Sequence, residues 1–422
     1  MERFAFRALP HRPKRQCFTR KLMKVFWTSK RIGFYAGCVL VLYLFFFVTW
    51  GHLKDLNYFP TGHNGVTSFS VFWVAARDFW NGSSLQDYSL SYIKNQVHLL
   101  DQQAKFSGDI GWFYPPTYFI FIAPIYWLPF SLMWQWTWVA MSGAFFIGAT
   151  EQYGHRLIRI LVVLASPGVI LNFSDGQNGL YFAGLMAFVL YQQEKNPKLA
   201  GVALGLLACK PQWVLLILPY WFLRKEWTGL FYAFLTSGVL ILISLVCLGP
   251  AVWYPGWWQG IAAAKQVIEL NPGHWRHGAT IYSLVRTLGG SSPLAYGTHG
   301  LVAVLIVGKI LWRSYKRPLE PLEKPLIVLG TFLVSPYWMD YDEVGLLVAI
   351  GFWVLQRRQY SSQRWAVLEW CCFILWLFPA LVPLSTWATH IQWGPLVLLI
   401  IFFIAGKNED GTQGRKEVLS VR

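Results

Sequence analysis

Residues 228–258 read TGLFYAFLTSGVLILISLVCLGPAVWYPGWW, a stretch without a single charged residue. A helix that crosses a lipid bilayer needs about 20 predominantly apolar residues, and this stretch exceeds that length. Two further uncharged stretches, 34–51 and 119–150, have the same character. Such repeated, membrane-length stretches predict an all-α fold, a polytopic bundle of transmembrane helices.

The composition supports this prediction and excludes a single soluble domain. The chain has 422 residues, of which 55% are hydrophobic and only 13% charged, whereas soluble domains carry about 25% charged residues. The net charge of +16 does not indicate nucleic acid, because ten basic residues fall within the first 31 positions and are typical of a cytoplasmic anchor. The region is too long for a signal peptide and lacks a cleavage site. The six cysteines form no CxxC pair, so we expect neither disulfides nor a metal site.

Polar and basic breaks divide the chain into about 12 membrane segments, some of them short or broken. We expect 117–149 to cross once or to form two helices at the turn around Pro129. The apolar segments are 33–50, 117–149, 157–171, 179–193, 199–209, 212–223, 228–248, 295–312, 325–336, 343–356, 365–380 and 386–405.

Basic breaks predict the orientation, because loops rich in Lys and Arg remain in the cytoplasm. Both termini are then cytoplasmic, and breaks such as 174–179, 210–212, 336–342 and 381–385 face the other side. The expected organisation is a basic cytoplasmic tail (1–32), one transmembrane domain (33–405) with large extracytoplasmic loops at 51–116 and 249–293, and a cytoplasmic tail (406–422).

The two large loops are rich in aromatic residues. Apolar positions recur at helical spacing over Ser68–Trp80, which predicts an amphipathic helix in the membrane interface with Trp73 and Trp80 as anchors. The second loop contains Trp253, Tyr254, Trp257, Trp258 and Trp275. These residues are either interfacial anchors or platforms for sugar rings or lipid.

Polar motifs gather at the ends of segments expected to face away from the cytoplasm. The turn 175–179 (DGQNG) could bind a hydroxylated or phosphorylated head group through its amides and through the N–H groups that open the next helix. Lys210, in the sequence KPQ, has two interpretations. Its side chain either extends to the membrane interface or serves as a cation for a lipid-linked phosphate.

The segment 336–343 (PYWMDYDE) places three acids between two membrane segments. They could supply a general base, partner Lys210 or Arg286, hold a divalent metal, or form a solvated turn. The sequence 274–277 (HWRH) could bind phosphate. Walker A, HExxH, GxSxG and strand-linked GxGxxG motifs do not occur, so the usual markers of ATP-driven transport, hydrolysis and dinucleotide chemistry are lacking.

Several motifs in this order resemble glycosyltransferase family 87, over residues 66–355. The resemblance rests on 72–76 (FWVAA), 87–88 (DY), 114–116 (YPP), 176–179 (GQNG), 199–206 (LAGVALGL), 210–212 (KPQ) and 336–342 (PYWMDYD). It implies a fold of the GT-C type with its site on the non-cytoplasmic face. It also implies transfer of a sugar, typically mannose, from a polyprenyl-phosphate donor to a glycan or glycolipid.

One departure from the family pattern concerns the catalytic base. Relatives begin the first-loop motif with Asp-Phe, whereas this chain has Ser68 and Phe69, and a serine cannot replace a carboxylate as a base at neutral pH. Asp78, Asp87 or Asp55 would substitute, or the chain has lost catalysis.

The predicted site therefore contains residues from both loops and from the breaks between segments. It comprises the catalytic candidates Asp78, Asp87 and Asp342 and the substrate-binding candidates Ser68, Tyr114, Asp175, Gln177, Asn178, Lys210, Gln212, Arg276, Arg286, Tyr337 and Asp340.

The expected activity is a hexosyltransferase in a bacterial inner membrane, without a cofactor or nucleic-acid partner and with no metal ligands assigned. The alternatives are a transporter or flippase for a lipid-linked sugar, and an inactive relative that acts as a membrane partner. The former lacks the inverted repeats typical of transporters, and the latter depends on Ser68.

Overall fold

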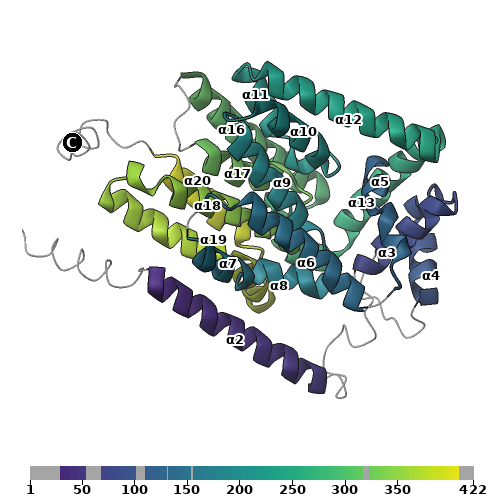
Figure 1. Ribbon diagram of the computed structural model, residues 1–422, viewed down its shortest axis with the longest axis horizontal. Coiled ribbons are helices and arrows are strands. Elements are labelled where there is room, and N and C mark those ends of the chain that lie inside the picture. Colours follow the sequence, from purple (N-terminus) through teal and green to yellow (C-terminus); the bar gives the residue numbers. More distant parts are fainter. Residues whose placement is uncertain are drawn as a thin grey trace, which may run out of the picture.

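A computed structural model describes residues 29–53, 68–100, 110–130, 132–153, 155–316 and 323–407. These ranges contain helices and connecting turns, with no strand among them (Figure 1). The helices are α2 (Ser29–Leu53), α3 (Ser68–Trp80), η2 (Gln86–Tyr88), α4 (Leu90–Leu100), α5 (Thr117–Ile122), η3 (Ala123–Trp127), α6 (Leu132–Ala149), α7 (Arg156–Leu164), α8 (Pro167–Asp175), α9 (Gly179–Gln192), α10 (Pro197–Leu207), η4 (Pro211–Trp213), α11 (Ile217–Leu223), α12 (Trp227–Leu248), η5 (Pro250–Val252), η6 (Trp253–Trp257), α13 (Trp258–Leu270), α14 (Pro272–His277), α15 (Ile281–Thr287), α16 (Ser292–Lys316), α17 (Glu323–Val334), η7 (Asp340–Gly345), α18 (Leu346–Leu355), η8 (Arg357–Gln359), α19 (Ser362–Thr389) and α20 (Gly394–Ala405).

Helix length supports a membrane protein but does not establish 12 crossings. Among the described residues, three helices are long and apolar enough to span a bilayer, and the bent pair α7 and α8 would add a fourth. The three are Trp227–Leu248, Ser292–Tyr315 and Ser362–Thr389. Six shorter apolar helices accompany them. Many of the predicted segments are therefore short pieces within a bundle.

The division of one predicted segment is confirmed, a second segment is bent where no break was predicted, and one predicted break is wrong. The segment 117–149 forms two helical parts, α5 with η3 and then α6, separated at the turn 128–130. The segment 157–171 breaks where Pro167 opens α8, and the two helices meet at 56°. The predicted break at 381–385 lies inside α19, which continues past Pro379 and Pro383 and ends at Thr389. The turn to α20 therefore falls at 390–393.

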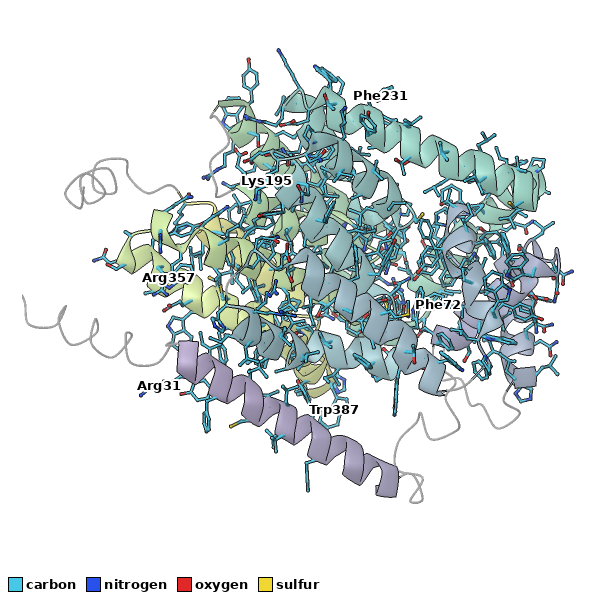
Figure 2. The ribbon with its side chains drawn as sticks, in the orientation of Figure 1. Arg31, Phe72, Lys195, Phe231, Arg357 and Trp387 are labelled. Atoms are coloured by element: carbon cyan, nitrogen blue, oxygen red, sulfur yellow. The ribbon has the colours of Figure 1, made fainter. Side chains whose placement is uncertain are left out.

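The bundle is built around helices that are buried on most faces. α9 packs between α6 and α10, and α10 also packs along α12. α2 and α12 run along opposite edges of the molecule, while α3, α4, α5 and α13 lie together at one end (Figure 1). Arg31, Lys195 and Arg357 lie toward the opposite end from Phe72 of α3 (Figure 2). The basic breaks and the first loop are thus separated along the molecule.

The predicted helix over Ser68–Trp80 is confirmed as α3, and its placement in the membrane interface stays a prediction. Eight of its side chains, including Phe72 and Asp78, are buried in the protein. The indole of Trp73 donates to the carbonyl of Leu128 at 3.0 Å, and that of Trp80 donates to the carbonyl of Ala123 at 2.8 Å. These two hydrogen bonds attach α3 to η3 and to the residue after it, although Trp80 itself stays 49% exposed.

The two large loops pack against each other. A Cβ at Gly260 of α13 would lie 2.4 Å from the ring of Tyr88, so only glycine permits this approach. The hydroxyl of Tyr88 donates to the carbonyl of Tyr114 at 2.9 Å, where the first loop ends. The tails 1–32 and 406–422 fall mostly outside the described residues, and Asp55 lies wholly outside them.

Candidate active site

The centre of the polar region is a buried ion pair between Lys210 and Asp342. Lys210 lies between the end of α10 and η4, and its Nζ is 2.5 Å from Oδ1 of Asp342 in η7. Both side chains are almost fully buried. Among the uses considered for the acidic segment, partnership with Lys210 is confirmed. A charge in such surroundings is tolerated only with a close partner, so each residue holds the other in place.

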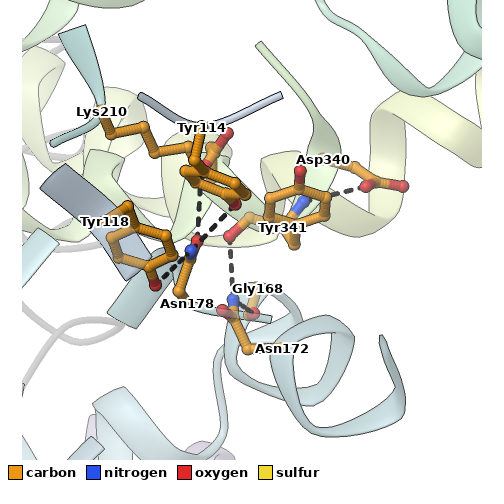
Figure 3. A network of polar contacts seen from close by, with 9 residues as sticks. Tyr114, Tyr118, Gly168, Asn172, Asn178, Lys210, Asp340 and Tyr341 are labelled. Atoms are coloured by element: carbon orange, nitrogen blue, oxygen red, sulfur yellow. Dashed lines mark hydrogen bonds and ion pairs between the residues drawn. The ribbon is translucent and has the colours of Figure 1, made fainter. Parts of the chain in front are cut away.

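Asn178 extends this pair into a network (Figure 3). Its Oδ1 accepts from Lys210 at 3.2 Å, and its Nδ2 donates to the hydroxyls of Tyr114 and Tyr118 at 2.9 and 2.8 Å. Asn178 is the residue before α9, but its side chain makes no hydrogen bond that caps this helix. The amide that was predicted to bind a ligand head group is therefore engaged inside the protein.

Backbone approach explains the glycines on either side of this network. Gly176 has a positive φ of 63° and ends α8, a conformation that favours glycine. A Cβ at Gly179 would lie 2.4 Å from the carbonyl oxygen of Tyr341. Asn172 donates to that same carbonyl at 2.8 Å. The turn 176–179 therefore packs tightly against η7.

A second pair joins η7 to the second large loop. Nδ1 of His277, the last residue of α14, lies 2.7 Å from Oδ2 of Asp340. The side chain of His277 is 54% exposed, while that of Asp340 is 7% exposed. The hydrogen bond to Asp340 raises the pKa of His277, with Asp175 contributing, and burial and His277 lower the pKa of His274 to about 4. His277 is therefore an accessible imidazole oriented by a buried carboxylate.

Asp78 and Asp87 lie together in the first loop, away from solvent. Asp78 is 1% exposed and accepts from Arg77 and from Tyr92, each at 2.8 Å. Asp87 is fully buried, and neither of its carboxyl oxygens has a hydrogen-bond partner among the described residues. Burial, followed by the Asp78 carboxylate, raises the pKa of Asp87 well above its usual range. In this arrangement neither acid is accessible to an acceptor hydroxyl, and their catalytic assignment stays a prediction.

Ser68 opens α3 beside the turn at 175–176. A Cβ at Gly176 would lie 2.6 Å from Cβ of the adjacent residue, Phe69. The turn at 175–176 therefore packs against the start of α3, and Asp175 contributes to the raised pKa of His277. Asp175 itself accepts a hydrogen bond from Ser174 at 3.2 Å.

The remaining candidates differ in how fully they are engaged. Arg286 donates to the carbonyls of Gly290 and Glu269 and stacks on Trp275, so it fastens the second loop. Arg276 is exposed, and no partner of its guanidinium is recorded among the described residues. Gln177 is buried, whereas Gln212 and Tyr337 are partly or largely exposed. Ligand binding by these residues stays a prediction.

Two members of the network were missed from the sequence. Asn172 and Tyr118 lie inside apolar segments, where a single polar residue is weak grounds for a site. An asparagine in a membrane segment is costly unless it is paired, and that signal alone could have identified Asn172. In the described ranges, no three His, Cys, Asp or Glu side chains gather closely enough to hold a metal ion.

An apolar groove begins beside Lys210. Its volume is about 250 Å³, and Cys209 and Pro211, the neighbours of Lys210, belong to its lining. The other lining residues are Pro115, Thr117, Gly205, Ala208, Ser237, Leu240, Ile241, Trp253 and Trp257. The groove is therefore bounded by both large loops, α10 and α12, and it suits an aliphatic chain.

These features define an all-helical protein with several apolar helices, whose polar site lies where two large loops meet the bundle. The sequence profile of glycosyltransferase family 87 matches residues 112–336, more than half of the chain, and the chain belongs to this family. Comparisons with curated proteins and with solved structures gave no match. Family membership implies a glycosyltransferase, and hence a sugar donor and an acceptor.

Proposed function

We propose that this chain transfers a sugar, mannose in our assignment, from a polyprenyl-phosphate donor to a glycan or glycolipid. The site is assigned to the non-cytoplasmic face of a bacterial inner membrane, with both termini cytoplasmic. One observation carries the proposal. The apolar groove lies beside Lys210, which is paired with Asp342 of η7, and Asp340 of the same segment binds the accessible His277. We assign the lipid chain to the groove and the reacting hydroxyl to the neighbourhood of His277.

The groove is assigned to the isoprenoid part of the donor. Its walls are almost entirely apolar, and the indoles of Trp253 and Trp257 form one side. Apolar surface removed from water contributes about 25 cal/mol per Å², so a long lipid would gain much of its affinity here. The phosphate would then lie at the end of the groove near η7.

Arg276 is the cation that we assign to the donor phosphate. Asp342 already neutralises Lys210, whereas the guanidinium of Arg276 is exposed next to His277. Guanidinium groups bind phosphate oxygens through two parallel hydrogen bonds. Lys210 is assigned to holding η7, which positions Asp340.

His277 is assigned as the proton acceptor that compensates for Ser68. Because Asp340 accepts from Nδ1–H, the free lone pair lies on Nε2. The acceptor oxygen forms a bond to the anomeric carbon as the bond between that carbon and the phosphate oxygen breaks. The proton passes to Nε2 of His277, and polyprenyl phosphate leaves with the bonding electrons.

The groove assignment is tested with donors that differ only in lipid length. Ile241 lines the groove, and Ile243 on the same helix does not, yet both are 39% exposed. Ile241→Trp should raise KM for a long polyprenyl-phosphate-mannose and leave a short-chain analogue unaffected, while Ile243→Trp should change neither. Equal KM values for the long donor in both variants would contradict the assignment.

A further inference from the structure

A second pocket lies where α6 ends and α7 begins, away from the groove. Its volume is about 540 Å³. Apolar residues of α6 and α7, among them Ile147 and Ile160, form one part of its wall, and Glu151, Arg156 and Arg159 form the polar part. α6 begins at Leu132, and its pocket residues Ala144, Ile147 and Gly148 lie about 18–24 Å along the helix from that end.

Arg159 is the unusual residue of this pocket. Its Nε and Nη1 are buried and have no hydrogen-bond partner among the described residues. By contrast, Arg364 uses Nη2 to reach the carbonyls of Ile404 and Ala405 at the end of α20. Arg159 as a whole is only partly buried, but these two nitrogens have lost their hydration without replacement. They can therefore donate to an acceptor from outside the chain.

Two further features favour an anion. Arg156 is exposed at the mouth of the pocket, so a second guanidinium is available. It is also the first residue of α7, and the preceding His155 makes no side-chain bond to the start of that helix. Free N–H groups at a helix start attract anions. Glu151 is exposed, and its negative charge disfavours an anion in the pocket.

We propose that this pocket binds the phosphate of an anionic membrane lipid, with the acyl chains against the apolar wall. Basic pockets between membrane helices on the cytoplasmic side suit such head groups, and the basic break at Arg156 and Arg159 faces the cytoplasm if the segment 117–149 crosses the membrane once. The proposal is independent of the transferase chemistry, because none of these residues belongs to the candidate active site.

The experiment titrates phosphatidylglycerol or phosphatidylcholine into the detergent-purified full chain and counts retained lipid by native mass spectrometry. Arg159→Gln should weaken phosphatidylglycerol retention about tenfold, as expected for one charge-assisted contact. Glu151→Gln should strengthen it. Arg358→Gln is the matched control, since Arg358 is exposed on η8 outside the pocket, and should change nothing.

A competition arm separates the two sources of phosphate. Displacement of phosphatidylglycerol by inorganic phosphate would support a site that recognises phosphate alone, and resistance to it would support a lipid site. Equal phosphatidylglycerol retention by the unmodified chain and Arg159→Gln, with both eluting as monodisperse protein, would overturn the proposal. Equal retention of phosphatidylcholine and phosphatidylglycerol by the unmodified chain would also overturn it.

Discussion

Nζ of Lys210 lies 2.5 Å from Oδ1 of Asp342, although 132 positions separate the two residues in the sequence. The pair joins the turn after α10 to η7, and η7 also carries Asp340, the partner of His277. The segment η7 therefore contacts both the buried Lys210, whose neighbours Cys209 and Pro211 line the groove, and the accessible imidazole of His277. The arrangement makes the geometry of His277 dependent on an ion pair that it does not touch.

The first prediction concerns the stability of that pair. Lys210→Met or Asp342→Leu alone leaves one buried charge unpaired and should lower the free energy of unfolding by about 3–5 kcal/mol. The double variant removes both charges and should regain most of the loss. Unfolding of the purified protein in detergent, followed by tryptophan fluorescence, measures all four proteins. Losses in the single variants that simply add in the double variant would show that the two side chains are not coupled.

The second prediction concerns pH. A base works in its deprotonated form, so transfer should rise with pH through the pKa of His277. Because the hydrogen bond to Asp340 raises that pKa, Asp340→Asn should move the acid limb of kcat/KM to lower pH. His277→Gln should reduce kcat by about 10²–10⁴-fold.

His274→Gln is the control for this series, because His274 lies on the same short helix and is not paired with a carboxylate in the described structure. It should leave the pH limb in place. An acid limb that is identical in the unmodified chain and in Asp340→Asn would exclude His277 as the acceptor of the proton.

The third prediction tests compensation between Ser68 and His277. Ser68→Asp places a carboxylate at the start of α3, where no acidic residue occurs in the first turn. It should restore transfer to His277→Gln, and it should stabilise the helix slightly, by about 0.3–1 kcal/mol. Transfer is measured in membranes with matched protein levels. Full activity of His277→Gln alone would show that His277 does not supply the base. An inactive His277→Gln that Ser68→Asp does not rescue would show that a carboxylate at position 68 cannot replace it.

The fourth prediction concerns Asp87. Its raised pKa means that the folded protein favours the neutral acid. The stability provided by neutral Asp87 is fully present below the pKa of an unfolded aspartate, near 3.9, and is lost progressively as pH rises toward the folded value. Asp87→Asn should lack this pH dependence and be as stable as, or more stable than, the unmodified chain at pH 7.

Thermal unfolding between pH 4 and 8 compares the two proteins. Parallel curves across this range would contradict the raised pKa. A large loss of transfer in Asp87→Asn at unchanged stability would instead favour the catalytic role that the sequence suggests for this residue.

Apolar stretches and proline positions predicted much of the fold. The helix over Ser68–Trp80 and the division of 117–149 follow from local patterns, whereas the bend at Pro167 was not predicted. The continuity of α19 through Pro379 and Pro383 could not be predicted, because helix interruption by proline depends on whether packing on both sides holds the axis. The burial of α3 depends on acceptors at Leu128 and Ala123, which are distant in sequence.

The site was predicted as a set of motifs but not as an arrangement. Lys210 and Asp342 were identified individually, since charges in apolar surroundings require partners, and their pairing was one of several alternatives. The engagement of Asn178 with two tyrosines was not predictable, because it depends on the position of α5 against α9. His277 is accessible whereas Asp78 and Asp87 are buried, and this difference could be seen only in the folded loops.

The most direct test of the central claim is transfer of radiolabelled mannose from polyprenyl-phosphate-mannose in membranes that contain this chain, with total lipid extract as acceptor. We predict a new labelled glycolipid that is absent from membranes lacking the chain and from membranes with His277→Gln. Absence of labelled product, with donor binding retained and other polyprenyl-phosphate sugars equally inactive, would contradict it.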